Sequence, residues 1–285
     1  MIFDGRACEL GEGPLWHPLL KQLFWFDILG NRLLSQTPDG PQEWQFGERV
    51  SAAGWVSAQD LLIASETGLF RFDLITGTRE VVAEVEADIP ATRSNDGRAD
   101  RQGGFWFGTM SKRGGRDPGA GAIYRLYRGE VRQLYAGITI PNSICFAPDG
   151  KTAHFADTVT HQVMRVALDG AGWPVGTPQV YLDFRAEGLS PDGAVCDAAG
   201  NIWVAQWGAA RVACHAPDGT RLRIVGFDAP HTSCPAFGGA GLETLFCTTA
   251  REGMSDADKA AWPQSGRTFA MAGVGRGLEE PKVIL

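Results

Sequence analysis

The sequence has no apolar run long enough to cross a membrane and no cluster of basic residues. A membrane helix needs about 20 consecutive apolar residues, and a signal peptide needs a basic start followed by an apolar run. The first residues instead carry Asp4 and Glu9. A net charge of -7 without a Lys/Arg run offers nothing to a phosphate backbone. We therefore expect a cytoplasmic protein that binds neither membranes nor nucleic acid.

Several catalytic motifs are also missing. The five histidines show no HExxH spacing, and no GxSxG elbow occurs, which argues against a zincin and against a serine hydrolase of that type. The six cysteines form no CxxC pair and mostly lie in apolar, strand-like runs such as SICFA and TLFCTT. We expect them to be buried, reduced thiols instead of disulfides or zinc ligands.

Helical periodicity is scarce, and what replaces it is a repeat. The one helical segment expected is SDADKAAW (255–262), with Ser255 as its cap. Elsewhere a turn, an aromatic-rich strand, a polar break and a second strand recur in six copies: 17–34, 57–73, 100–110, 147–168, 197–216 and 238–253. Their spacing is typical of four-stranded blades. The sequence predicts an all-β, six-bladed β-propeller spanning 1–285 as a single domain. The alternative is a pair of β-sandwiches, which would not need six similar units.

The repeat register singles out one position in each copy. It lies eight residues before the end of the turn that precedes the aromatic strand. In four copies this position holds an oxygen-bearing side chain: Glu12, Asn95, Asn142 and Asp192. In the other two copies it holds Ala52 and Ser233, which are small. Equivalent positions of a propeller surround its axis, so these side chains are expected to converge at the mouth of the central channel.

Two carboxylates and two amides make an oxygen cage for one divalent cation, with calcium, zinc, manganese and magnesium all open. The alternative is that these residues only form turns. Glu12 argues against it, since glutamate is not a favoured turn residue. Asp192 belongs to a Pro-Asp-Gly tripeptide that occurs four times, but Asp39 and Asp218 are expected between outer strands and Asp149 in an ordinary turn. Trp207 is a candidate to line the mouth and stack on a sugar.

Five stretches resemble the gluconolactonase/regucalcin (senescence marker protein) family of sugar-lactone hydrolases: LGEGPLWHP, RSNDGRADRQGGFWFGTM, ITIPNSICFAPDGKTAHFADT, SPDGAVCDAAGNIWVAQWG and CPAFGGAGLETLFCTTAREG. The resemblance implies a six-bladed propeller holding one divalent metal, with Glu12, Asn142 and Asp192 as ligands. It also implies that Asp192 is the general base and that Arg93 and Asn95 bind the substrate. Asp117, in the loop after GTM, is a further candidate substrate contact.

The resulting hypothesis is metal-dependent hydrolysis of a sugar lactone, an aldonolactone such as gluconolactone, xylonolactone or arabinonolactone, to its sugar acid. In it the metal polarises the carbonyl and Asp192 activates water. Two alternatives remain: a metal-dependent esterase or phosphotriesterase on the same fold, and a non-catalytic metal-binding propeller. We expect a small-molecule partner and a monomer.

Overall fold

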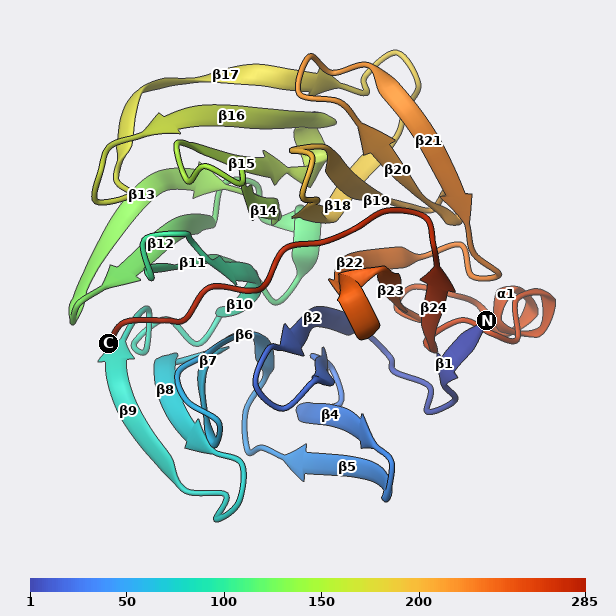
Figure 1. Cartoon of the computed structure of the whole chain (residues 1–285), viewed down its shortest axis with the longest axis horizontal. Helices are drawn as coiled ribbons and strands as arrows, with labels where there is room; N and C mark the ends of the chain where they lie inside the picture. The colour runs from blue at the N-terminus through green and yellow to red at the C-terminus, as the bar shows by residue number, and fades with distance from the viewer.

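Six four-stranded antiparallel sheets surround a common axis in the computed structural model, which describes residues 1–285 (Figure 1). In blades one to five the strands follow chain order from the axis outward. The first strands of neighbouring blades contact one another around the axis. The predicted six-bladed β-propeller is therefore confirmed.

The first five blades are continuous in sequence. Blade one contains β2 (Gly11–His17), β3 (Gln22–Asp27), β4 (Arg32–Thr37) and β5 (Gly40–Gln45). Blade two contains β6 (Val50–Trp55), β7 (Asp60–Ser65), β8 (Gly68–Asp73) and β9 (Arg79–Glu84). Blade three contains β10 (Thr92–Ala99), β11 (Phe105–Ser111), β12 (Gly121–Tyr127) and β13 (Glu130–Ile138). Blade four contains β14 (Pro141–Phe146), β15 (Thr152–Asp157), β16 (Gln162–Leu168) and β17 (Pro174–Asp183). Blade five contains β18 (Ser190–Cys196), β19 (Ile202–Trp207), β20 (Arg211–His215) and β21 (Arg221–Gly226).

Blade six joins the two ends of the chain. It contains β22 (Thr232–Gly238), β23 (Thr244–Thr249) and β24 (Thr268–Ala272), and its outer strand is the N-terminal β1 (Ile2–Asp4). Ile2 pairs with Phe269 in antiparallel register. The ring is thus closed by backbone hydrogen bonds between segments from opposite ends of the sequence, which also covers one edge of the last blade.

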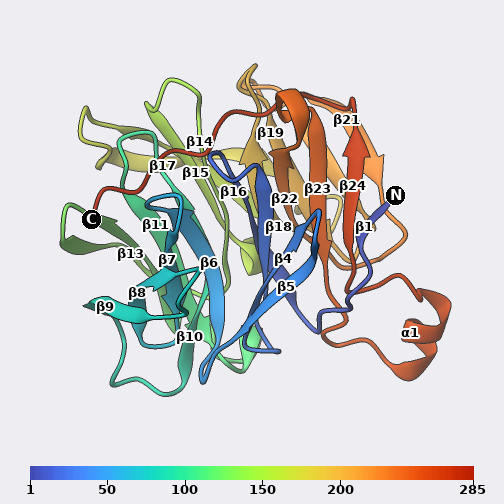
Figure 2. The ribbon, with the colours of Figure 1, turned by 60° about the horizontal axis from the view of Figure 1, so that its bottom comes forward.

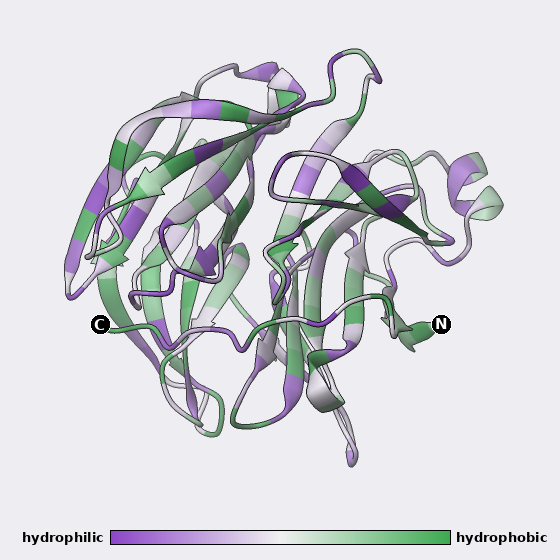
Figure 3. Cartoon of the chain, turned by 45° about the horizontal axis from the view of Figure 1, so that its top comes forward, coloured by the Kyte–Doolittle hydropathy of each residue, from purple (hydrophilic) through white to green (hydrophobic).

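The inner strands are the most apolar part of each blade. Every residue of β2 and of β14 is buried, whereas the outer strands β5 and β9 are mostly exposed. Figure 3 shows the same contrast, with apolar colouring on the strands inside the ring and more polar residues toward its rim. Large aromatic side chains fill the space between blades, and Trp25, Trp106 and Trp203 are fully buried. All six cysteines are buried and unpaired, as predicted.

Helices are few and short. Three are 3-10 turns: η1 (Gly114–Arg116), η2 (Thr158–Thr160) and η3 (Ala240–Leu242). The single α-helix, α1 (Asp256–Ala261), lies outside the ring beside blade six (Figure 2). Ser255 caps it in a reciprocal pair with Asp258, which confirms the predicted cap. None of these helices has the length and apolar character that a membrane span requires.

The C-terminal residues 273–285 form no strand and cross one face of the ring (Figure 1). The Val283 amide donates to the Trp55 carbonyl at 2.9 Å, and the Ile284 amide donates to the Gly103 carbonyl at 2.8 Å. The Glu280 carboxylate forms a buried ion pair with Arg98 of the inner strand β10. This segment therefore ties blade six to blades two and three at the end of the axis opposite to the starts of the inner strands.

Candidate active site

The first strand of every blade breaks its regular pairing at the position that the repeat register singled out. The register shifts lie between Glu12 and Leu15, between Asn142 and Cys145, and at the matching points of the other four blades. Gly13 follows Glu12 with φ 52°, a conformation that favours glycine. A bulge changes the direction of the side chains beside it. Here a bulge occurs in each blade at the same end of the axis, and we call this end the mouth.

The predicted residues meet at this mouth. Glu12, Asn95, Asn142 and Asp192 all line one cavity of about 220 Å³, and so does Arg93. Ala52 and Ser233 occupy the two remaining positions and are fully buried. We call these six positions the inner ring: Glu12, Ala52, Asn95, Asn142, Asp192 and Ser233. The structure thus brings together every predicted site residue except Asp117.

A chain of hydrogen bonds fixes the two amides. Arg93 Nη1 donates to Asn95 Oδ1 at 2.7 Å, so the Asn95 amide nitrogen points the other way and donates to Asn142 Oδ1 at 3.1 Å. Asn142 Nδ2 in turn donates to Thr158 Oγ1 at 2.8 Å. Arginine can only donate, and this sets the direction of the whole chain. The Arg93 Nε and Nη2 groups have no acceptor in the protein, so they remain available to a ligand.

The two carboxylates of the inner ring are buried without a counter-ion. Neither Glu12 nor Asp192 has an ion-pair partner, and each is 5% exposed. Burial, followed by the charge of Asp96, raises the pKa of Glu12 to about 8. Burial, followed by the charge of Glu12, raises the pKa of Asp192 well above its usual range. Carboxylates that resist ionisation for these reasons need a cation beside them to be charged at neutral pH. The donor set, two carboxylates with amide oxygens, therefore fits a hard divalent cation.

Asp96 is an acidic neighbour that the sequence analysis did not single out. It is buried, and its carboxylate accepts hydrogen bonds from the Ile144 amide at 2.8 Å and from the Gly97 amide at 2.9 Å. Burial raises its pKa to about 6. Because its two oxygens already bind backbone donors, it contributes negative charge below the cavity and does not line it.

A second set of residues surrounds the cavity above the inner ring. In an antiparallel blade the second strand ends where the first begins, so the residue at or just after its end also reaches the mouth. We call these six residues the outer ring: Leu29, Glu66, Lys112, Thr158, Trp207 and Glu252. All but Glu66 line the cavity, and Glu66 binds the Lys112 ammonium at 2.8 Å. Of these residues the sequence analysis named only Trp207, whose ring stacks on His231 with centroids 4.2 Å apart.

Asp117 does not line the cavity. Its carboxylate accepts a hydrogen bond from Ser111 Oγ at 2.6 Å and lies 3.6 Å from the Arg113 guanidinium. The same loop reaches the cavity through Lys112 and Gly114 instead. A substrate contact by Asp117 stays a prediction.

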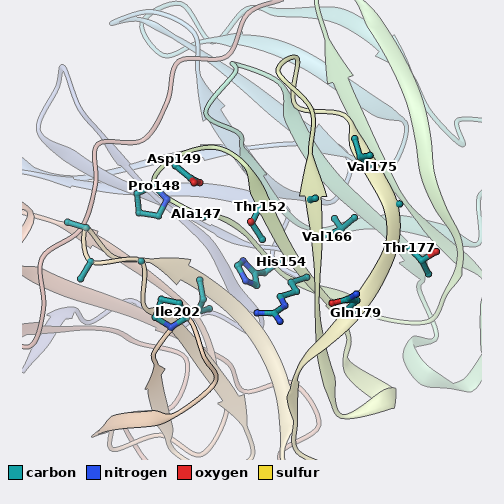
Figure 4. A pocket seen from close by; sticks show the side chains of 17 residues that line it. Ala147, Pro148, Asp149, Thr152, His154, Val166, Val175, Thr177, Gln179 and Ile202 are labelled. Atoms are coloured by element: carbon teal, nitrogen blue, oxygen red, sulfur yellow. The ribbon is translucent and has the colours of Figure 1, made fainter.

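A larger cavity lies elsewhere. A cavity of about 780 Å³ opens between blades four and five and is lined by His154, Arg165, Gln179 and their neighbours (Figure 4). It contains none of the residues that converge at the mouth. We take the smaller cavity as the candidate site, because two buried carboxylates without ion-pair partners converge there with Arg93.

Comparison with known proteins agrees with the fold. The crystal structure of regucalcin, a calcium-binding protein from Agrobacterium tumefaciens, superimposes with a TM-score of 0.96 and 39% identity, covering 100% of this chain and 97% of that one. A 6-deoxy-6-sulfogluconolactonase of Pseudomonas putida is 36% identical over 95% of this chain and 94% of its own. An L-arabinolactonase of Azospirillum brasilense is 35% identical over 94% of this chain and 90% of its own. Residues 10–251 match the family described as the SMP-30/Gluconolactonase/LRE-like region. This range includes the whole inner ring and every member of the outer ring except Glu252. The chain belongs to this family.

Proposed function

We propose that the chain hydrolyses a sugar lactone to its sugar acid in the cavity at the mouth, with one divalent cation bound by Glu12, Asn142 and Asp192. The observation that carries the proposal is the pair of buried carboxylates without a counter-ion, next to an arginine with unused donors. The chain is a lactonase, as are its relatives named 6-deoxy-6-sulfogluconolactonase and L-arabinolactonase. The calcium-binding protein of similar structure supports a divalent cation and leaves its identity open among calcium, zinc, manganese and magnesium.

The reaction adds water to the lactone carbonyl and breaks the ring carbon–oxygen bond. A divalent cation in this donor set would supply Lewis-acid polarisation of the carbonyl and stabilise the oxyanion. Asp192 takes the proton of the attacking water as general base. When the tetrahedral intermediate collapses, the same proton passes to the leaving ring oxygen, which becomes the hydroxyl of the sugar acid. The protein therefore returns to its starting protonation state.

The remaining residues orient the substrate. Arg93 donates through Nε and Nη2 to lactone oxygens and assists the developing negative charge. Asn95 accepts a hydrogen bond from the Arg93 guanidinium at 2.7 Å and donates one to the Asn142 side chain at 3.1 Å. It therefore links the substrate-binding arginine to a proposed metal-binding residue. Trp207, stacked on His231, offers an apolar face to the sugar ring.

The repeated Pro-Asp-Gly tripeptide provides a matched control for the test. Asp192→Ala should lower kcat/KM for D-glucono-1,5-lactone and L-arabino-1,4-lactone by at least about a hundredfold, the usual contribution of a general base. Asp218→Ala alters an exposed turn in the same local sequence and should leave both rates unchanged. A pH-indicator assay with EDTA treatment and metal add-back measures both variants. Retained lactone hydrolysis by Asp192→Ala would overturn the proposed mechanism. Turnover of aryl esters or phosphotriesters alone would favour an esterase, and no turnover in any state would favour a binding protein.

A further inference from the structure

Lys112 is the only cationic residue of the outer ring. It follows β11 and lines the cavity, and 28% of its side chain is exposed. Its ammonium donates one hydrogen bond in the protein, to Glu66 Oε2 at 2.8 Å from the neighbouring blade. An ammonium has three donors, so two remain for a ligand in the cavity. Glu66 holds the flexible lysine in place and thereby reduces the entropy that a ligand would have to remove.

Glu66 does not neutralise this side of the cavity. Its other carboxylate oxygen lies 3.6 Å from Arg49 Nε, so one carboxylate is shared by two cations. Arg93, from the adjacent inner strand, adds a third cation, and no carboxylate lies within ion-pair distance of it. Three cations and one carboxylate leave two positive charges on the wall formed by blades two and three. We call these four residues the basic wall: Arg49, Glu66, Arg93 and Lys112.

Another part of the cavity wall is acidic. Glu12, Asp192 and Glu252 come from blades one, five and six, and none of them has an ion-pair partner. Glu12 and Asp192 would hold a divalent cation there, which would offset part of this charge and supply Lewis-acid polarisation of the lactone carbonyl. The cavity is thus polarised, with the reacting end of a substrate on the acidic side and its remote end beside Lys112. A remote end with a negative charge matches this arrangement better than a neutral hydroxymethyl group.

We propose that Lys112 determines specificity for sugar lactones that carry an anionic group, such as a carboxylate, at the end remote from the lactone carbonyl. The inference rests on the proposed lactone hydrolysis and adds the substrate class. Lys112 binds the anionic group directly, Glu66 positions Lys112, and Arg93 and Arg49 supply the surrounding positive potential. A charge-assisted hydrogen bond of this kind favours the anionic lactone over its neutral counterpart by about tenfold to hundredfold.

The test compares D-glucono-1,4-lactone with D-glucaro-1,4-lactone, which have the same ring and differ in a terminal hydroxymethyl group against a carboxylate. Lys112→Met should lower the ratio of kcat/KM for the glucarolactone to that for the gluconolactone by about tenfold to hundredfold, mainly through KM. Lys112→Arg should restore most of the ratio because it keeps the charge. Lys151→Met removes an exposed charge on the β14–β15 turn and should leave the ratio unchanged, which controls for the net charge of the protein.

Two results would count against these conclusions in different ways. If Lys112→Met changes kcat/KM for both lactones by the same factor, the specificity inference is wrong. It is also wrong if both wild type and Lys112→Met hydrolyse the gluconolactone with the higher kcat/KM. In either case the lactonase proposal stands. If neither lactone is hydrolysed by the metal-loaded wild type, the proposed function itself fails, and the inference fails with it.

Discussion

Removing the divalent cation should make the protein less stable as the pH rises, and Glu12→Gln should suppress this effect. In the folded, metal-free protein the pKa of Glu12 is raised to about 8, first by burial and then by the charge of Asp96. In the unfolded chain this glutamate titrates at about 4.5. Between these two values the folded state keeps a proton that the unfolded state has released. The free energy of unfolding therefore decreases as the pH rises through this window and is highest below it.

The size of the effect follows from the two pKa values of Glu12. The interval from about 4.5 to about 8, at roughly 1.4 kcal/mol per pH unit, corresponds to a loss on the order of 5 kcal/mol. For a chain of this length that lowers Tm by ~10 to 20 °C. Glu12→Gln removes the titrating group, and it also removes one of the charges that raise the pKa of Asp192. The variant should thus lose much less stability between pH 5 and pH 8.5.

Calorimetry in EDTA at pH 5 and pH 8.5 measures this difference. At pH 8.5 the Tm of wild type should lie well below that of the Glu12→Gln variant. Adding a divalent cation should raise the Tm of wild type by more than it raises the Tm of the variant. Glu80→Gln, at a carboxylate that is 73% exposed, is the matched control and should behave like wild type. Parallel changes in Tm for wild type and Glu12→Gln across this pH range would refute the reasoning.

Three further substitutions test the scaffold of the propeller. Arg125→Met leaves the fully buried Asp100 carboxylate without its cation, so urea unfolding should show a loss of about 3 to 5 kcal/mol while KM stays constant. Glu280→Gln weakens the hold of the C-terminal residues on Arg98, and limited proteolysis should cleave after residue 273 faster than in wild type. Gly193→Ala places a methyl group against the Cys234 thiol of the adjacent inner strand β22, closer than van der Waals contact allows, which should cost about 1 to 3 kcal/mol of stability and weaken metal binding in titration calorimetry.

The inner ring was predictable because the repeat carries its register. One position relative to a recognisable turn holds Glu12, Asn95, Asn142 and Asp192. Because the blades are arranged symmetrically about the axis, residues at the same position in different blades lie close together at the mouth. The same argument separated Asp192 from the aspartates of the other three tripeptides, which lie in turns between strands of a blade.

The outer ring was less accessible, because its members lie at different distances from the ends of their strands: Trp207 is the last residue of β19, whereas Glu252 lies three residues after β23. The chemistry of its members differs from blade to blade, so Lys112, Thr158 and Glu252 share no residue type that would mark them. The loop that holds Asp117 is longer than the equivalent loops of blades one, two, four and five, so the repeat gives it no register and its direction does not follow from sequence. The place of β1 was not predictable either, because a three-residue strand has no periodicity and its partner lies at the far end of the chain.

The closure of blade six also has a consequence for the order of folding during synthesis. Residues 2–4 leave the ribosome before every other strand of the propeller, but their partner strand β24 follows all the others. Until then the finished blades form an open arc with an unpaired sheet edge, the kind of surface that recruits other chains. The earliest strand is therefore the last to be placed, and a nascent chain has to keep it free while some 260 further residues are made.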